Sequence, residues 1–163
     1  MKYFFDTEFY ESGYQNPIRL ISIGIVSEDN RTYYAVVDDI DLNDTSDWLK
    51  ENVIPFLRDK PKPRSLIAKE IKEFLNVEQD RNLEFWSYFA DYDWVVFCQI
   101  FGTMINMPGN MPHYCNDIVQ VMRQTGIRKS QLPMHTGQVH NALDDAIWHK
   151  QIYNKMFELL TKS

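Results

Sequence analysis

Apolar and β-branched residues form three short runs near the start of the chain, with turn-forming residues between them. The runs at residues 3–9, 20–26 and 31–37 are each typical of a β-strand. Residues 27–30 form a turn cluster, and a connection this short joins antiparallel neighbours. The pattern therefore predicts an antiparallel meander of three strands.

From residue 46 onward the apolar positions recur mainly at helical spacing, interrupted by short strand-like runs. Ser46 is a suitable N-cap for a helix over residues 47–57, which Pro55 limits near its end. The other elements are expected in this order: an amphipathic helix at 65–75, a strand at 84–89, a helix at 93–101, a short strand at 113–118, a helix at 118–126 ended by Gly126, and a helix from 141 to about 160. Loops are expected at 59–64, 103–112 and 128–138.

Three adjacent antiparallel strands followed by alternating helices and strands are typical of the α/β class, with helices packed against a mixed sheet. The 163 residues fit one domain spanning 1–163, and 44% hydrophobic with 14% aromatic residues is a globular composition. No apolar run approaches the roughly 20 residues that span a bilayer, and the N-terminus lacks the features of a signal peptide. We therefore expect a cytoplasmic protein.

The balance of charges is acidic, with 17 Lys and Arg against 23 Asp and Glu and a net charge of −6. Proteins that hold long duplex nucleic acid through many phosphates are usually basic on at least one face. The basic residues here form one modest cluster, Arg58, Lys60, Lys62 and Arg64, with Arg123, Arg128 and Lys129 elsewhere. If nucleic acid is the substrate, metal ions must supply much of the positive charge and the bound stretch is short.

The two cysteines, Cys98 and Cys115, lie far apart and fit neither a disulfide framework nor a paired zinc motif. His113 stands close to Cys115, but two ligands without a second pair are weak evidence for zinc. We expect a structural role for both cysteines.

Asp6 and Glu8 lie on the first predicted strand, directly after the apolar run Tyr3-Phe4-Phe5. Residues two apart on a strand project from the same face, so these carboxylates are expected roughly 7 Å apart along the strand. Carboxylates are rarely buried without a cation or a hydrogen-bond partner, and the pair therefore suggests a metal site. The alternative is an edge strand with two solvated acids.

Asp93 follows the fourth predicted strand, at the expected start of a helix. A carboxylate at this position is favoured by the helix N-terminus, so a purely structural role as an N-cap is the alternative. Asp91 is a rival for either role.

His140 and Asp145 lie at the start of the final helix, in the segment His140-Asn141-Ala142-Leu143-Asp144-Asp145-Ala146. The alternatives are that Asp145 complements the helix dipole and that His140 is a hydrogen-bonded core histidine. Asp144 is a rival of Asp145, because it shares a helix side with Trp148.

The joint order of these motifs resembles the DEDDh family of 3′–5′ exonucleases: Asp-x-Glu on the first strand, an Asp after a later strand, and His-x-x-x-x-Asp on the last helix. The resemblance spans Phe5 to about Ile147 and implies a ribonuclease H-like fold with a mixed central sheet of about five strands flanked by helices. It implies a site made of four acids and a histidine: Asp6, Glu8, Asp93, Asp145 and His140.

Within this resemblance, two details of the sequence decide which of two neighbouring acids belongs to the site. The segment Tyr92-Asp93-Trp94-Val95-Val96-Phe97 resembles the aromatic-Asp-x-x-aliphatic second motif of the family, which favours Asp93 over Asp91. The family places four residues between its His and Asp, which favours Asp145 over Asp144.

One departure is that the second motif of the family often has Asn a few residues before its Asp, where this chain reads Ser87-Tyr88-Phe89-Ala90-Asp91. A closer resemblance is to compact RNase T-like exoribonucleases of bacteria and phages, on the segments Tyr-Phe-Phe-Asp-Thr-Glu-Phe and His-Asn-Ala-Leu-Asp-Asp-Ala.

The resemblance implies hydrolysis of phosphodiester bonds from a 3′ end with release of 5′-mononucleotides. Hard oxygen ligands suit two Mg²⁺ or Mn²⁺ ions, about 3.5–4 Å apart in such sites, held by Asp6, Glu8, Asp93 and Asp145, with Asp6 between them. His140, with an ordinary pKa of about 6.5, is expected to take the proton from the attacking water.

The expected partner is the 3′ end of single-stranded nucleic acid or a short oligonucleotide, with RNA favoured over DNA. The resemblance also suggests a homodimer. The expected substrate contacts include the backbone of Thr7 and Glu8 at the terminal ribose and apolar faces near the site from Phe9, Leu20, Ile23, Trp86 and Tyr92. The alternatives are a DNA exonuclease with the same site and a nucleotide-binding scaffold of the same fold that does not hydrolyse.

Overall fold

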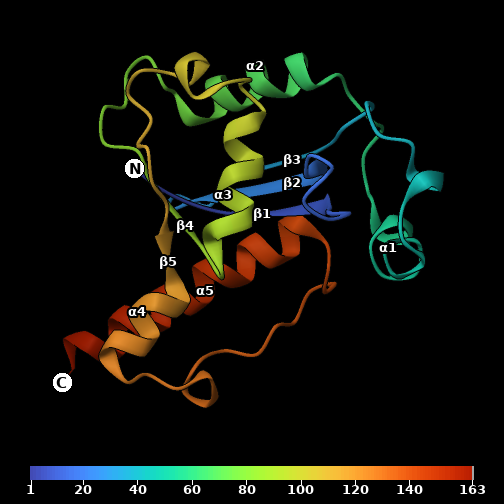
Figure 1. Cartoon of the computed structure of the whole chain (residues 1–163). Helices are drawn as coiled ribbons and strands as arrows, with labels where there is room; N and C mark the ends of the chain where they lie inside the picture. Colours follow the sequence, from blue (N-terminus) through green and yellow to red (C-terminus); the bar gives the residue numbers. More distant parts are fainter. Residues whose placement is uncertain (163) are drawn as a thin grey trace.

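A mixed five-stranded sheet forms the centre of the protein, seen edge-on in Figure 1. A computed structural model describes residues 1–162. The strands lie in the order β3-β2-β1-β4-β5. Their bounds are Lys2–Tyr10 for β1, Arg19–Ser27 for β2, Thr32–Val36 for β3, Glu84–Ser87 for β4 and Asn116–Asp117 for β5.

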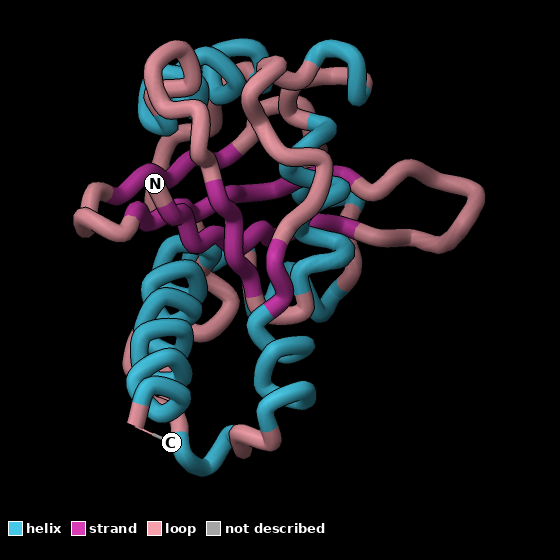
Figure 2. Tube along the Cα trace, turned by 90° about the vertical axis from the view of Figure 1, so that its left-hand side faces the viewer, coloured by secondary structure: helices cyan, strands magenta, loops and turns pink. Residues whose placement is uncertain are grey.

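The first three strands pair antiparallel, as the sequence predicts, and β4 joins β1 in parallel. β5 extends the parallel half of the sheet at its other edge. The trace in Figure 2 shows the strands crossing the middle of the molecule, between helical layers. β1, which carries Asp6 and Glu8, is therefore the central strand of the sheet and not an edge strand.

Helices cover both faces of this sheet. α2 (Arg64–Leu75) and α3 (Ala90–Gln99) lie on one face, and α4 (Ile118–Thr125) and α5 (Ala142–Thr161) lie on the other (Figure 1). The short α1 (Asp47–Asn52) lies beside the sheet. Single 3₁₀ turns occur at Leu42–Asp44, Ile54–Phe56, Met104–Asn106 and Lys129–Gln131.

The two larger hydrophobic cores of the described residues follow from this layering. Alternate residues of β1 divide between them, with Phe5 facing α3 and Phe4 facing α5. Burying both faces of a sheet in this way accounts for the nearly continuous apolar run of β2. Among residues 1–162, no helix is long and apolar enough to cross a membrane.

The predicted elements are all present, but several boundaries are shifted, and the strand expected at 84–89 ends at Ser87. The expected helix at 47–57 ends at Asn52 and continues as a separate 3₁₀ turn that contains Pro55, because proline lacks the N–H that would continue the helix. The helix expected from Asp93 begins earlier, at Ala90, after Phe89 in a left-handed conformation with φ of 60°. The fifth strand is only two residues long. Cys98 and Cys115 are free thiols, and both pack against the hydrophobic core that contains Phe5.

Candidate active site

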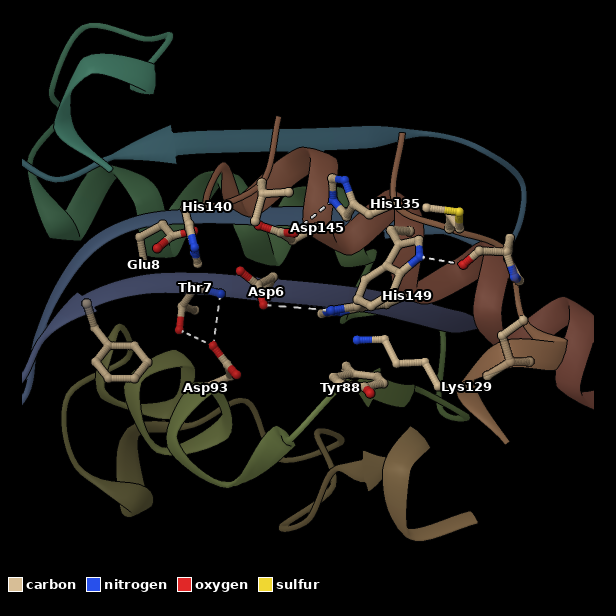
Figure 3. Close-up of a pocket in the computed structure, with 16 residues that line it drawn as sticks. Asp6, Thr7, Glu8, Tyr88, Asp93, Lys129, His135, His140, Asp145 and His149 are labelled. Carbon is tan, nitrogen blue, oxygen red and sulfur yellow. Dashed lines mark hydrogen bonds and ion pairs between the residues drawn. The ribbon is translucent and has the colours of Figure 1, made fainter. Parts of the chain in front are cut away.

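A cavity of about 590 Å³ opens where the last half of β1 meets the start of α3 and the start of α5. Its remaining wall comes from Tyr88, which follows β4, and from the segment 129–140 that leads into α5. Figure 3 shows the side chains that converge on it from these separate parts of the sequence. Ligand sites of small molecules commonly have volumes of roughly 300–1,000 Å³.

Asp6, Glu8 and Asp145 form a carboxylate cluster inside this cavity. Each offers an oxygen atom, and these oxygens all lie within 4.8 Å of one another. The strand period of two places Asp6 and Glu8 on one face of β1, and α5 brings Asp145 to that face in its first turn. Asn141 caps this helix, because its side chain accepts a hydrogen bond from the backbone N–H of Asp144 at 3.3 Å.

Asp93 enters the same cavity from α3 and is held by Thr7. Oδ1 of Asp93 accepts hydrogen bonds from the backbone N–H of Thr7 at 3.0 Å and from its hydroxyl at 2.5 Å. Asp93 is only 7% exposed, whereas Asp91 is exposed and lies outside the cavity. Because Phe89 occupies the N-cap position of α3, Asp93 does not cap this helix.

Asp144, the rival of Asp145, has other partners. Its carboxylate forms a two-pronged ion pair with Arg58, at 2.9 and 2.5 Å, and accepts a hydrogen bond from the backbone N–H of Gln138 at 2.8 Å. The Arg58 guanidinium accordingly lowers the pKa of Asp144. Asp144 thus links the segment before α5 to Arg58, while Asp145 lines the cavity.

Burial and mutual repulsion raise the pKa values of the cavity carboxyls. Burial, and then the charges of Asp93, Glu8 and Asp145, raise the pKa of Asp6 well above its ordinary value. Burial, and then the charges of Asp145 and Asp93, raise the pKa of Glu8 to about 8, and burial raises that of Asp93 to about 6 against the lowering effect of the Thr7 hydrogen bonds. Burial also raises the pKa of Asp145.

Such a cluster of buried acids favours a bound cation. Like charges this close repel one another unless they are protonated or neutralised. The donor atoms are all carboxylate oxygens, which suit a hard divalent cation such as Mg²⁺ or Mn²⁺ better than zinc. The residues present therefore fit the metal site that the sequence predicts.

His140 lines the cavity on the side of Glu8, as Figure 3 shows. Its backbone is left-handed, with φ of 64°, and it directly precedes the N-cap residue of α5. The ring packs edge-on against Trp48 of α1 with centroids 4.9 Å apart. His140 is therefore positioned by contacts from outside its own helix, and it is not a core histidine.

Two further histidines of the cavity were missed by the sequence analysis. The ring of His149 is buried: its Nδ1–H donates to the backbone carbonyl of Phe5 at 3.0 Å, and its Nε2 lies 3.9 Å from Oδ1 of Asp6. Burial lowers the pKa of His149 to about 4. Nε2 of His135 lies 2.8 Å from Oδ1 of Asp145. The spacing of four from Asp145 to His149 is a signal that could have been used, whereas His135 lies in a loop without a pattern.

The predicted substrate contacts divide into two groups. Thr7, Glu8 and Phe9 line the cavity, and the exposed ring of Tyr92 stacks on Phe9 with centroids 5.9 Å apart. Three other residues are buried in the cores and offer no face for a base: Leu20, Ile23 and Trp86. Trp86 instead packs against Tyr153 and Phe157 of α5, so its expected role in substrate binding is corrected to a structural one.

Comparison with known proteins gives consistent matches. The profile of one family, described as the 3′-5′ exoribonuclease Rv2179c-like domain, matches residues 1–157. Two relatives from Mycobacterium tuberculosis, named 3′-5′ exoribonuclease Rv2179c (strain H37Rv) and 3′-5′ exoribonuclease MT2234.1 (strain CDC 1551), are each 36% identical over 153 residues, which covers 90% of this chain and 87% of theirs.

Solved structures share the fold at lower identity. The nuclease domain of 3′hExo, a DEDDh family member bound to rAMP, matches with a TM-score of 0.64 at 15% identity over 99% of this chain and 92% of its own. Exonuclease I matches with a TM-score of 0.63 at 15% identity over 98% of this chain and 43% of its own. These matches confirm the predicted ribonuclease H-like α/β fold.

Proposed function

Because this chain belongs to the Rv2179c-like 3′-5′ exoribonuclease domain family, we propose that its cavity hydrolyses the 3′-terminal phosphodiester bond of RNA and releases a 5′-mononucleotide. The observation that carries the proposal is the convergence of Asp6, Glu8, Asp93 and Asp145 on one cavity that also contains His140.

Asp6, Glu8, Asp93 and Asp145 are the residues that would hold two Mg²⁺ or Mn²⁺ ions. The ions would neutralise the phosphate, activate a water and stabilise the departing 3′ oxygen. The fit rests on the donor set, which consists of oxygen atoms only, and on the raised pKa values that signal mutual repulsion of the carboxylates. Thr7 orients Asp93 through two hydrogen bonds to the same oxygen.

His140 acts as the general base that takes the proton from the attacking water. It is half-buried, borders Glu8 in the cavity and is held against Trp48, so its ring is presented to the site and not to bulk solvent. Of the other two cavity histidines, His149 donates its Nδ1 proton to Phe5 and is kept neutral by burial, and His135 contacts Asp145. These contacts occupy His149 and His135, and they favour His140 as the base.

The terminal nucleotide is placed against Phe9, whose ring Tyr92 supports from behind. Its ribose then lies beside the backbone of Thr7 and Glu8, where contact with a 2′-hydroxyl would favour RNA over DNA. The net charge of −6 is consistent with a short bound stretch. A homodimer and a cytoplasmic location stay predictions of the sequence.

The test is a digestion of matched RNA and DNA oligomers of several lengths in Mn²⁺, with wild type and with Asp6→Ala. We expect release of mononucleotides from RNA, slower release from DNA, and no release by Asp6→Ala. Faster digestion of DNA would identify a deoxyribonuclease with the same site. Binding of oligonucleotide without any release by the wild type would identify a scaffold that does not hydrolyse, and would contradict the proposal.

A further inference from the structure

The cavity extends beyond the carboxylates to a group of residues without a role in the chemistry proposed above. Tyr88, Lys129 and Trp148 line this second part, which we term the aromatic annex. In Figure 3, Glu8 and His140 lie on one side of Asp6, and Tyr88 and Lys129 lie on the other. The annex and the candidate base are therefore at opposite ends of one cavity.

The rings of the annex are held in fixed positions. The indole N–H of Trp148 donates to the backbone carbonyl of Pro133 at 2.9 Å, and the ring centroids of Tyr88 and Trp148 lie 5.3 Å apart at a tilt of 44°. Both rings are half-buried. Two aromatic faces that are already positioned can stack on a planar base without a large cost in conformational entropy.

Lys129 supplies the positive charge of the annex. Its Nζ lies 5.8 Å from the Tyr88 ring centroid and 5.6 Å from that of Trp148, and within residues 1–162 it forms no ion pair with a carboxylate. No other Lys or Arg lines the cavity in the described part of the chain. A lysine without a carboxylate partner beside two aromatic rings matches the combined phosphate and base of a nucleotide.

The direction of the reaction decides which nucleotide reaches the annex. In a phosphoryl transfer the attacking and leaving oxygens lie roughly in line, on opposite sides of the phosphorus. With His140 as the base, the attacking water enters from the His140 side of the carboxylates. The leaving 3′ oxygen, and the nucleotide that carries it, then lie on the opposite side, where the annex is.

From these observations, and resting on the proposed function, we propose that the aromatic annex binds the nucleotide on the 5′ side of the scissile bond. Tyr88 and Trp148 receive its base and Lys129 binds its 5′-phosphate. Among dinucleotides, the protein is thereby selective for those that carry a 5′-phosphate.

The first test compares two substrates that share a 3′-terminal adenosine 5′-phosphate. One is the 5′-phosphorylated adenylate dinucleotide, and the other is the p-nitrophenyl ester of adenosine 5′-monophosphate, which lacks the second phosphate. We expect Lys129→Gln to lower the ratio of the two kcat/KM values by about tenfold, the loss of one charge-assisted contact. The matched control is Lys69→Gln, an exposed lysine of α2 on the other face of the sheet, which should leave the ratio as in wild type.

An equal loss on both substrates, or no loss on either, would overturn the proposal. If the wild type cleaves neither substrate, the proposed function fails, and the annex is tested by binding instead. Calorimetry in the same Mn²⁺ buffer would compare adenosine 5′-monophosphate with a dinucleotide whose bridging oxygen is replaced by methylene. The proposal is supported if Lys129→Gln and Tyr88→Leu each bind the dinucleotide about tenfold more weakly than the wild type does, with unchanged affinity for adenosine 5′-monophosphate. It is rejected if the wild type and both variants bind the dinucleotide with equal affinity.

Discussion

Gly24 of β2 lies directly against the backbone of Ala142, the first residue of α5. A Cβ atom at Gly24 would be 2.3 Å from the carbonyl carbon of Ala142, a distance that no real side chain tolerates. Gly24 also pairs with Asp6 in the register of β1 and β2. The absence of a side chain at residue 24 therefore lets the start of α5 approach the strand that carries Asp6, and this approach brings Asp145 into the carboxylate cluster.

Gly24→Ala should lower both the stability of the protein and its affinity for divalent ions. The added methyl group must push α5 away from the sheet, and overpacking of this kind costs about 1–3 kcal/mol. Thermal unfolding measures the change in stability. Titration of the folded variant with a divalent ion measures the change in metal affinity. Gly109→Ala is the matched control, because a Cβ at Gly109 meets no atom within 4 Å. Wild-type metal affinity in Gly24→Ala would contradict this account of how Asp145 is placed.

Thr7→Val should weaken metal binding and leave the fold intact. The substitution removes the hydroxyl that donates to Oδ1 of Asp93 but keeps the backbone N–H that donates to the same atom. Loss of a partner that orients a metal ligand typically costs 10–100-fold in affinity or activity, and we expect roughly the lower value. Titration with Mn²⁺ checks this. Thr7→Ser should restore most of the loss, and equal defects in both variants would show that the hydroxyl does not act.

The metal-free protein should lose stability as the pH rises. The pKa of Glu8 is raised from 4.5 to about 8 and that of Asp93 from 3.8 to about 6, so between these values the folded state binds more protons than the unfolded chain. The free energy of unfolding that these groups contribute is therefore fully present below about pH 4 and is lost as the pH rises to about 8.

Melting temperatures in chelator over this range measure the effect. With increasing pH, the melting temperature of the wild type should fall relative to that of Glu8→Gln, because Gln does not titrate. Adding Mn²⁺ at about pH 8 should raise the wild-type melting temperature more than that of Glu8→Gln. A difference that does not depend on pH would mean that folding does not raise the pKa of Glu8.

His140→Ala should lose most turnover while keeping metal and nucleotide binding. Removal of a general base typically costs about 10²–10⁴-fold in rate. The matched control is His113→Ala, an exposed histidine outside the cavity. Single-turnover kinetics with saturating RNA separates the chemical step from binding. Turnover at the wild-type rate in His140→Ala would remove His140 as the base.

The sequence predicted those parts of the site that follow from local periodicity. Asp6 and Glu8 share a face because strands alternate, and Asp145 lies in the first turn of the last helix, whose start the sequence predicted near residue 141. The resemblance to a nuclease family was needed to choose Asp93 and Asp145 over their neighbours. The structure gives a physical reason for each choice: Asp91 is exposed and lies outside the cavity, and Asp144 is already paired with Arg58.

The residues that were missed or misplaced depend on tertiary contacts. Trp86 was expected to stack on a base, but β4 is covered by helices on both faces, so no side chain of its strand reaches the cavity. Tyr88 and Lys129 reach the cavity from positions just after β4 and in a 3₁₀ turn, where no periodic pattern places them. The left-handed backbone of Phe89, the N-cap residue of α3, and of His140, just before the N-cap residue of α5, is likewise hard to predict, because residues other than glycine adopt it only rarely.

The central claim is that the cavity removes single nucleotides from the 3′ end of RNA. The most direct measurement uses one RNA oligomer labelled either in its last phosphodiester phosphate or at its 5′ end, digested in Mn²⁺ and analysed by product mass. We predict that the 3′ label is released first, as a 5′-mononucleotide, while the 5′ label passes through a ladder of chains shortened by one nucleotide at a time. Release of the 5′ label first, internal fragments, or a 3′-mononucleotide product would contradict the account.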